Sequence, residues 1–300
     1  MRIFVTGATG WIGTAVVPEL IAAGHRVVGL ARSDDAAATL VALGADVWRG
    51  QLDDPASLRA GAAESDGVIH LAYHHDFSRI EEAAHTDLAA INAIGEALEG
   101  TDRPFVVASG TLGLAPGRVS TERDAADPAI HPRVANAQVA LSLAERGVRS
   151  MIVRLAPTVH GTGDHGFVAT LVDIARARRE SGYIEDGTNR WPAVHRFDAA
   201  RLIRLGLNGA PAGSVLHATA EEGVPTRAIA EAIGRGLDLP VVSVPRDRAG
   251  EHFGWLGRFF GADAPASSAI TQELLAWRPS KPGLIADIDA GHYFQHVLAD

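Results

Sequence analysis

The sequence predicts an α/β fold in which a doubly wound parallel sheet is accompanied by a smaller C-terminal lobe. Short β-rich runs alternate with alanine-rich amphipathic stretches along the first half of the chain, a pattern typical of a parallel sheet with helices on both faces. The first run leads directly into three glycines, Gly7, Gly10 and Gly13. With 300 residues, 47% of them hydrophobic, the chain is long enough to bury a large core in one domain or in two lobes.

Six strands are expected in the first half, at about residues 2–6, 25–31, 45–49, 67–71, 104–109 and 148–155, with helices between them. Glycines mark several boundaries: Gly24, Gly44 and Gly147 each follow a helical pattern and precede a strand or its lead-in, as helix C-caps do. Right-handed crossovers between such units favour the doubly wound arrangement.

The regular alternation of short β-rich runs and alanine-rich stretches changes after Pro157. We expect a polar helix at about 167–180, a loop-rich stretch at 181–197, a helix beginning near Asp198, and a strand at about 214–218 that returns to the main sheet. Residues 1–165 and 194–222 are therefore assigned to the sheet domain, and residues 166–193 and 223–300 to the smaller lobe. The core of that lobe is expected to contain Phe253, Trp255, Phe259 and Phe260.

The turn from Gly7 to Gly13 predicts a dinucleotide-binding site because of what each glycine permits. Gly7 allows a tight turn, Gly10 lets the backbone approach a pyrophosphate, and Gly13 lets the helix pack closely on the strand. The free N–H groups of such a turn lie at the positive end of a helix, where phosphates bind. The cofactor-binding residues expected here are Gly7, Thr9, Gly10, Trp11, Ile12 and Gly13.

The end of the second strand favours NADP as the cofactor, with NAD as the alternative. A carboxylate at this point would hydrogen-bond the ribose 2′-hydroxyl of NAD, whereas this chain has Ala31 followed by Arg32 and Ser33. Arg32 and Ser33 can bind a 2′-phosphate through charge-assisted hydrogen bonds. Asp34 and Asp35 are expected to cap the following helix.

Composition narrows the range of functions. The net charge of −9 and the scattered arginines argue against nucleic acid as a partner. The absence of cysteine excludes disulfides, thiolate nucleophiles and cysteine-ligated metal centres. No secretory leader and no apolar run of membrane-spanning length is evident, so we expect a cytoplasmic protein that acts on a small-molecule substrate without a membrane partner.

Several short motifs can be recognised in sequence along the chain. They are Thr6-Gly7-Ala8-Thr9-Gly10-Trp11-Ile12-Gly13, His70-Leu71-Ala72, Ser109 with Thr111, Val159-His160-Gly161, the segment from Asn189 to Asp198, and Leu275-Ala276-Trp277-Arg278-Pro279-Ser280. In these motifs the chain resembles the short-chain dehydrogenase/reductase superfamily, in its extended branch of nucleotide-sugar epimerases and dehydratases and its atypical relatives. The resemblance implies a Rossmann domain and NAD(P)-dependent chemistry. It also places Gln51, Leu52, Leu71, Ala72 and Pro157 beside the cofactor.

One departure from the family pattern bears on mechanism. The family's catalytic Tyr-x-x-x-Lys pair falls where this sequence has Arg133 and Ala137, and Lys281 is the only lysine of the chain. A guanidinium stays protonated at working pH, so Arg133 cannot act as a general acid or base. Any proton transfer must therefore use other residues.

The remaining candidates for catalysis lie at the ends of the fourth and fifth strands. Ser109 and Thr111 can donate a hydrogen bond to a substrate oxygen, because the carboxyl edge of a parallel sheet is where ligands bind. Tyr73, His74 and His75 follow the fourth strand at the same edge, and Tyr73 and His75 are the leading proton donors.

A second polar cluster is expected in the segment after the sixth strand. His160, His165, Tyr183 and Trp191 are assigned to the substrate pocket, and His195 is assigned a catalytic role. The histidine pairs His70 with His74 and His292 with His296 have metal-ligand spacing on a helix. The first pair falls at a strand end and the second has no obvious third ligand nearby in sequence, so no metal is expected.

Three functions are consistent with these observations. The first is an NADP-dependent oxidoreductase that reduces a small ketone or aldehyde. The second is an epimerase, dehydratase or isomerase acting on a nucleotide sugar or another polar substrate, and the third is a dinucleotide-sensing protein without catalytic activity. Small residues in the alanine-rich helices near 79–99 and 133–146 also suggest a homodimer; they are Ala83, Ala90, Ala93, Ala97, Ala137, Ala140 and Ala144.

Overall fold

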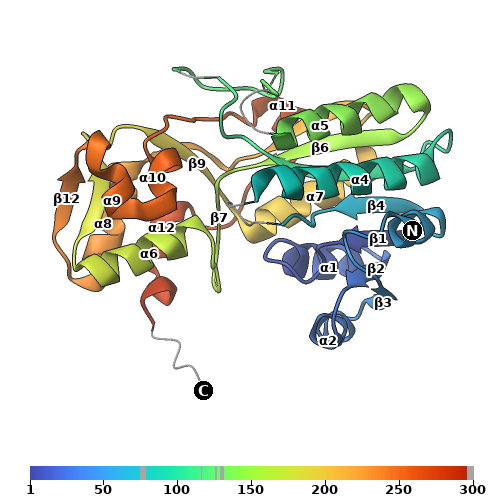
Figure 1. Cartoon of the computed structure of the whole chain (residues 1–300), viewed down its shortest axis with the longest axis horizontal. Helices are drawn as coiled ribbons and strands as arrows, with labels where there is room; N and C mark the ends of the chain where they lie inside the picture. The colour runs from blue at the N-terminus through green and yellow to red at the C-terminus, as the bar shows by residue number, and fades with distance from the viewer. Residues whose placement is uncertain (75–78, 116, 126, 129–131, 296–300) are drawn as a thin grey trace.

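A seven-stranded parallel sheet forms the centre of the computed structural model, which describes residues 1–74, 79–115, 117–125, 127–128 and 132–295 (Figure 1). The strands are β1 (Arg2–Thr6), β2 (Arg26–Ala31), β3 (Asp46–Arg49), β4 (Gly67–His70), β5 (Pro104–Gly110), β6 (Arg149–Leu155) and β10 (Ser214–Ala218). Their order is β10-β6-β5-β4-β1-β2-β3, and every neighbouring pair is parallel. The chain thus moves outward from β1 to β3 and returns to β4 on the other side of β1, which confirms the doubly wound fold.

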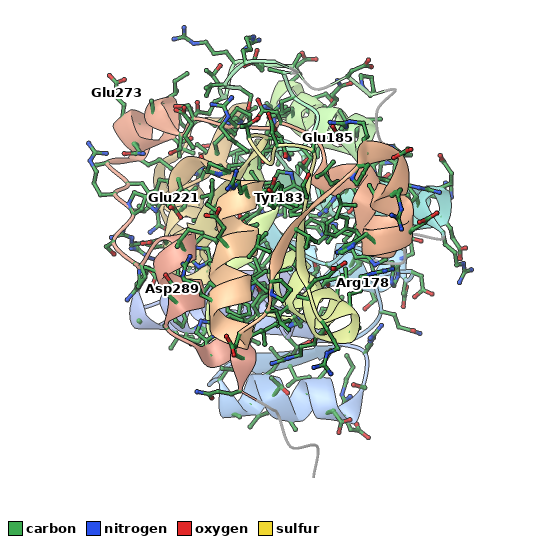
Figure 2. All side chains as sticks on the ribbon, turned by 90° about the vertical axis from the view of Figure 1, so that its left-hand side faces the viewer. Arg178, Tyr183, Glu185, Glu221, Glu273 and Asp289 are labelled. Atoms are coloured by element: carbon green, nitrogen blue, oxygen red, sulfur yellow. The ribbon has the colours of Figure 1, made fainter. Side chains whose placement is uncertain are left out.

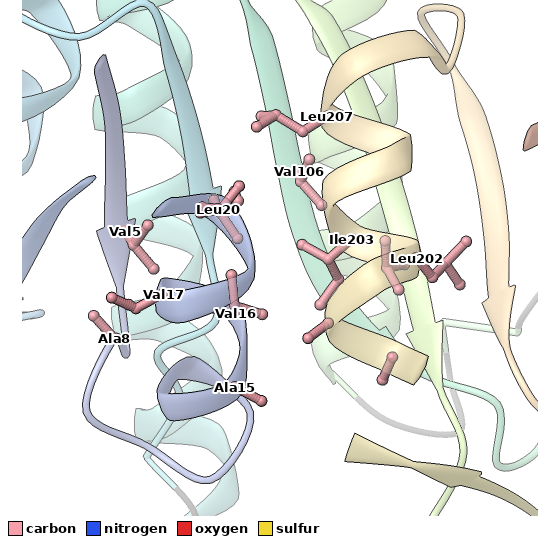
Figure 3. Packing of buried hydrophobic residues seen from close by; sticks show 14 of the residues in the cluster. Val5, Ala8, Ala15, Val16, Val17, Leu20, Val106, Leu202, Ile203 and Leu207 are labelled. Atoms are coloured by element: carbon pink, nitrogen blue, oxygen red, sulfur yellow. The ribbon is translucent and has the colours of Figure 1, made fainter. Parts of the chain in front are cut away.

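Helices cover both faces of this sheet. One face carries α1 (Gly13–Ala22), α2 (Asp34–Ala42) and α7 (Arg196–Gly209), and the other carries α3 (Pro55–Ala63), α4 (Ile80–Leu98) and α5 (Pro132–Ser142). On the first face, valines and leucines of α1 and α7 meet residues of β1 and β5, such as Val5 and Val106 (Figure 3). Gly147 is the C-cap of the turn Leu143–Arg146 with a φ of 71°, as expected, whereas Gly24 and Gly44, with φ of 83° and 82°, each lie one residue beyond the C-caps Ala23 and Leu43.

The second lobe is built around two small sheets. One has the order β11-β9-β7 and the other pairs β12 with β8. The strands are β7 (Thr158–His160), β8 (Ser181–Ile184), β9 (Arg190–His195), β11 (Glu221–Pro225) and β12 (Val241–Val244). The helices of this lobe are α6 (Phe167–Arg178), α8 (Thr226–Leu237), α9 (Ala249–Phe253), α10 (Gly257–Phe260) and α12 (Leu284–Asp289), and its 3-10 turns lie at Arg246–Arg248, Gly254–Leu256 and His292–Phe294. Helix α11 (Ala269–Leu275) packs instead against α7 and β10, and the 3-10 turn Leu143–Arg146 follows α5.

The expectation of a loop-rich stretch at 181–197 was wrong, because this segment contains β8 and β9. Pro192, Ala193 and Val194 are buried, and β9 pairs with β7 on one side and β11 on the other. These partners come from distant parts of the sequence, so the tertiary fold overrides the local Gly and Pro signals. Phe253 and Phe260 lie in the core of this lobe as expected, whereas Trp255 is 41% exposed.

The alanines that suggested a homodimer pack within the chain. Ala83, Ala90, Ala93 and Ala140 are at most 3% exposed, and α4 packs directly against α5. A homodimer therefore stays a prediction without support from these residues. In the part of the chain that the structure describes, no helix combines the length and apolarity needed to cross a membrane.

Candidate active site

The turn between β1 and α1 has the geometry of a phosphate-binding loop. Gly7 adopts a φ of 68°, and a Cβ at this position would lie 2.6 Å from the backbone nitrogen of Ala72. A Cβ at Gly13 would lie 2.1 Å from the carbonyl oxygen of Gly7, so neither glycine can be replaced without moving the backbone. Gly10 is exposed, and its N–H donates to the Gly7 carbonyl at 3.0 Å. The backbone is thus tightly packed around Gly7 and Gly13, whereas Gly10 is accessible at the surface of the turn.

The N–H groups that begin α1 are available to an anion. Those of Trp11, Ile12 and Gly13 have no hydrogen-bond acceptor among the residues that the structure describes, and no side chain caps the helix. Unpaired N–H groups and the positive end of the helix dipole together favour a bound phosphate. The residues of the turn therefore fit the pyrophosphate of a dinucleotide.

A buried hydrogen-bond network fixes the neighbouring end of β4. The Ala72 N–H donates to Thr6 Oγ1 at 3.3 Å, and Thr6 Oγ1 lies 2.7 Å from His70 Nδ1. His70 Nε2 lies 3.1 Å from Asp87, whose other oxygen accepts a 2.8 Å bond from Asn136. If the Thr6 hydroxyl donates to His70 Nδ1, the His70 proton lies on Nε2 and is donated to Asp87. This network ties β1, β4, α4 and α5 together directly beneath Leu71 and Ala72.

The pKa of the Asp87 carboxyl group is consistent with its place as the hydrogen-bond acceptor in this network. Burial by itself would raise the pKa of its carboxyl group, but the hydrogen bonds from His70 and Asn136 and the charge of Arg133 lower the pKa below its usual value. Asp87 is therefore ionised and holds the network in one arrangement. Asp87 and Asn136 were not singled out in the sequence, because only the packing of α4 against α5 brings them to His70.

Residues expected beside the adenosine end of the cofactor divide into two groups. Arg32 and Gln51 are exposed, and Arg32 makes no hydrogen bond or ion pair with any described residue. Ser33, by contrast, caps α2, because its Oγ accepts a 3.2 Å bond from the Ala36 N–H. Leu52 is 9% exposed and packs in the hydrophobic core.

A tyrosine that follows β4 and an arginine in the first turn of α5 lie against each other. The Arg133 guanidinium carbon lies 4.1 Å from the centre of the Tyr73 ring, and its Nη2 donates to the Ala108 carbonyl at 3.1 Å. Burial raises the pKa of the Tyr73 hydroxyl above its usual value, and the charge of Arg133 opposes this shift. Tyr73 thus keeps its proton near neutral pH, with a fixed cation against its ring.

The two hydroxyl candidates on β5 differ in their surroundings. Ser109 is 8% exposed, and its hydroxyl makes no hydrogen bond with a described residue. Thr111 is 1% exposed, and its hydroxyl donates to the Leu155 carbonyl at 3.4 Å. Ser109 is therefore the better placed of the two to bind a substrate oxygen. Of the remaining candidates at this edge, His74 is exposed and His75 lies outside the described residues.

The segment after β6 lies against the glycine turn through Trp11. The Trp11 indole donates to the Val159 carbonyl at 2.7 Å, and its ring meets that of His165 edge-on at 5.6 Å. Pro157, which precedes this segment, is partly buried. His165 is exposed, so it lies at the surface beside the turn.

His160 and His195 form a second pair, with ring centres 5.4 Å apart. His160 Nδ1 lies 2.9 Å from Asp287, while its buried Nε2 has no described partner. His195 Nδ1 accepts the Phe197 N–H at 3.3 Å and so caps α7. Burial lowers the pKa of His195, and the nearby His160 contributes to this shift.

Two of the residues assigned to the substrate pocket lie elsewhere. Trp191 is fully buried in the core of the second lobe, where it packs against Phe167 and Phe260, so it offers a substrate no exposed surface. Tyr183 lies on β8 under Arg227, whose guanidinium is 5.4 Å from its ring. Figure 2 shows the molecule from the side of this lobe with Tyr183 labelled, and β12, the partner of β8, lies at the end of the lobe away from the main sheet in Figure 1.

The described residues contain no group of three or more His, Asp or Glu side chains arranged to hold a metal ion. His292 lies 3.2 Å from Asp287, and its sequence partner His296 is outside the described residues.

Comparisons with known proteins agree with this geometry. A model of the NAD dependent epimerase/dehydratase family matches residues 3–216. An uncharacterized protein of Schizosaccharomyces pombe is 48% identical over 98% of this chain and 100% of its own length. The 2′-dehydrokanamycin reductase of Streptomyces kanamyceticus is 31% identical over 84% of this chain and 71% of its own.

Solved structures agree on the fold. A dTDP-glucose 4,6-dehydratase of Streptomyces venezuelae, solved with NAD bound, superposes with a TM-score of 0.78 at 19% identity, covering 97% of this chain and 96% of that one. At this level of identity the likeness concerns the fold alone.

Proposed function

We propose that this chain, which belongs to the NAD-dependent epimerase/dehydratase family, is an NADP-dependent oxidoreductase that reduces a small ketone or aldehyde. The observation that carries this proposal is the contact of Tyr73 with Arg133 at the carboxyl edge of the sheet. The similarity to a reductase at 31% identity supports the same reaction class.

The preference for NADP rests on Arg32. Its exposed guanidinium follows β2 and has no described partner, so it is available to a 2′-phosphate without breaking an existing ion pair. The bound dinucleotide supplies a hydride for the substrate carbonyl carbon. The unpaired N–H groups of Trp11, Ile12 and Gly13 bind its phosphates.

Tyr73 and Ser109 act on the carbonyl oxygen. Ser109 donates a hydrogen bond that orients this oxygen, and Tyr73 donates the proton that the developing alkoxide requires. The fixed positive charge of Arg133 stabilises the phenolate that Tyr73 leaves behind. Arg133 therefore serves as the cation next to the acid, although it cannot be the acid itself.

A panel of ketones and aldehydes, followed by the loss of NADPH absorbance, tests the proposal. With the best substrate, Tyr73→Phe should lower kcat by about 100-fold, since general-acid catalysis typically contributes 10²–10⁴-fold. The Kd for NADPH should change less than about twofold, because the phenyl ring still packs against Arg133.

Tyr183→Phe is the matched control, because Tyr183 lies on the outer part of the second lobe and should leave kcat unchanged. Full activity of the Tyr73→Phe enzyme would remove Tyr73 as the acid. Binding of NADPH without turnover of any carbonyl would instead favour a sensor of the dinucleotide.

A further inference from the structure

Arg196 lies directly over the indole ring of Trp11. Its guanidinium carbon is 4.2 Å from the Trp11 ring centre and 4.9 Å from that of Phe197. Trp11 is held in turn by its hydrogen bond to Val159. A guanidinium placed against two rings has lost much of its rotational freedom before any ligand arrives, so little further entropy is lost when it binds one.

Helices α1 and α7 run side by side in parallel. Trp11 contacts Arg196 at the N-terminal ends of the two helices, and Glu19 pairs with Arg204 at 2.6 Å further along them. Both pairs are separated by 185 residues in sequence, as expected for two parallel helices in constant register. Figure 3 shows the two helices on the same face of the sheet. The positive ends of both helices therefore lie at the carboxyl edge of the sheet, where Arg196 adds a full charge.

The charge of Arg196 is not neutralised by a direct partner. Arg196 makes no hydrogen bond or ion pair with a described residue, and its buried Nε has no acceptor. Asp164 is the acidic group that acts on it electrostatically. The carboxylate of Asp164 is already occupied, because one oxygen accepts the Gly166 N–H at 2.7 Å and the other accepts the Tyr293 hydroxyl at 2.8 Å.

We propose that Arg196 binds the pyrophosphate bridge of the dinucleotide, and that Trp11 and Phe197 hold its guanidinium in place for this purpose. This inference rests on the proposed function, since it assigns a residue to the same cofactor site. It divides the recognition of the two anionic parts of NADP between two arginines: Arg196 for the pyrophosphate and Arg32 for the 2′-phosphate.

Two fragments of the cofactor separate these roles. ADP-ribose contains the pyrophosphate but no 2′-phosphate, whereas adenosine 2′-monophosphate contains the 2′-phosphate but no pyrophosphate. Titration calorimetry of the whole chain should show that Arg196→Met weakens ADP-ribose binding by about tenfold and changes adenosine 2′-monophosphate binding by less than twofold. Arg32→Met should show the reverse pattern.

Two further variants keep the test specific. Arg196→Lys, which retains the charge, should recover part of the ADP-ribose affinity. Arg204→Met removes an arginine from the same helix, outside the site, and should leave ADP-ribose binding unchanged. The ADP-ribose Kd of the wild type should also rise more steeply with salt than that of Arg196→Met.

Three results would overturn the inference. The first is an unchanged ADP-ribose affinity in Arg196→Met. The second is a loss of affinity in Arg196→Met that is equal for ADP-ribose and adenosine 2′-monophosphate, and the third is a loss of ADP-ribose affinity in Arg204→Met as large as that in Arg196→Met. The second and third results would indicate a structural role for Arg196. If the wild type bound neither fragment, the proposed function itself would fail, and this outcome differs from a failure of the Arg196 variants alone.

Discussion

At the scale of single residues, Arg133 is the most consequential side chain of the site. In the sequence alone, Arg133 is seen only to replace the tyrosine of the family pattern, which suggests that the family's proton transfer has been lost. In the structure Arg133, on α5, lies against the ring of Tyr73, which comes from the segment after β4. A tyrosine and a neighbouring cation are thus in contact, although neither follows the family's spacing.

Replacement of Arg133 tests this pairing. Arg133→Met should lower kcat by about tenfold, because the phenolate of Tyr73 loses a stabilising charge at close range. Arg133→Lys should retain more activity than the methionine variant, since it keeps the charge. Steady-state kinetics with NADPH and the best carbonyl substrate would measure both, and wild-type kcat in Arg133→Met would exclude the proposed role.

The sequence predicts single residues best where one short motif determines the local backbone geometry, as in the glycine turn. The positions of Gly7, Gly10 and Gly13 follow from the backbone alone, and the structure shows the turn that they permit. Arg196 and Asp87 were missed because their partners are 185 and 17 residues away. Nothing in local spacing indicates that Arg196 meets Trp11.

At the scale of elements, the strands of the main sheet could be predicted within a residue or two, because buried parallel strands are continuous apolar runs flanked by glycines. Strands β8 and β9 could not, because their pairing partners β12 and β11 come much later in the chain. The alanines of α4 and α5 suggested contacts between two copies of the chain, and that homodimer stays a prediction. They serve the packing of these two helices within one chain.

At the scale of the whole molecule, buried histidines make stability depend on pH. Burial lowers the pKa of His195, His217 and His252 below the usual value of 6.5, so these side chains take up a proton less readily in the folded state than in the unfolded chain. The unfolded chain binds more protons than the folded one below about pH 6.5, and the free energy of unfolding should therefore fall as the pH decreases from 7.5 to about 5.5. Asp164 opposes this loss of stability at low pH. Burial raises the pKa of its carboxyl group above 3.8, so the folded chain binds this proton more readily than the unfolded chain does.

Denaturant unfolding at a series of pH values measures this effect, and a loss of about 1 kcal/mol or more is expected between pH 7.5 and 5.5. His217 is fully buried, with Nδ1 2.8 Å from the Ser267 carbonyl and Nε2 3.3 Å from Arg154, so His217→Gln should flatten the pH dependence. His85→Gln, a change at an exposed position on α4, should leave it unchanged. A stability that is flat over this range in the wild type would contradict the prediction.

We propose that the turn after β1 binds a dinucleotide and that Arg32 selects NADP. The most direct measurement is a calorimetric titration of the purified chain with NADPH and, separately, with NADH. We predict saturable binding of one molecule per chain, with NADPH bound about tenfold more tightly, the equivalent of one charge-assisted hydrogen bond of about 1.4 kcal/mol. Tighter binding of NADH would contradict the role of Arg32, and the absence of saturable binding by either dinucleotide would contradict the proposed cofactor site itself.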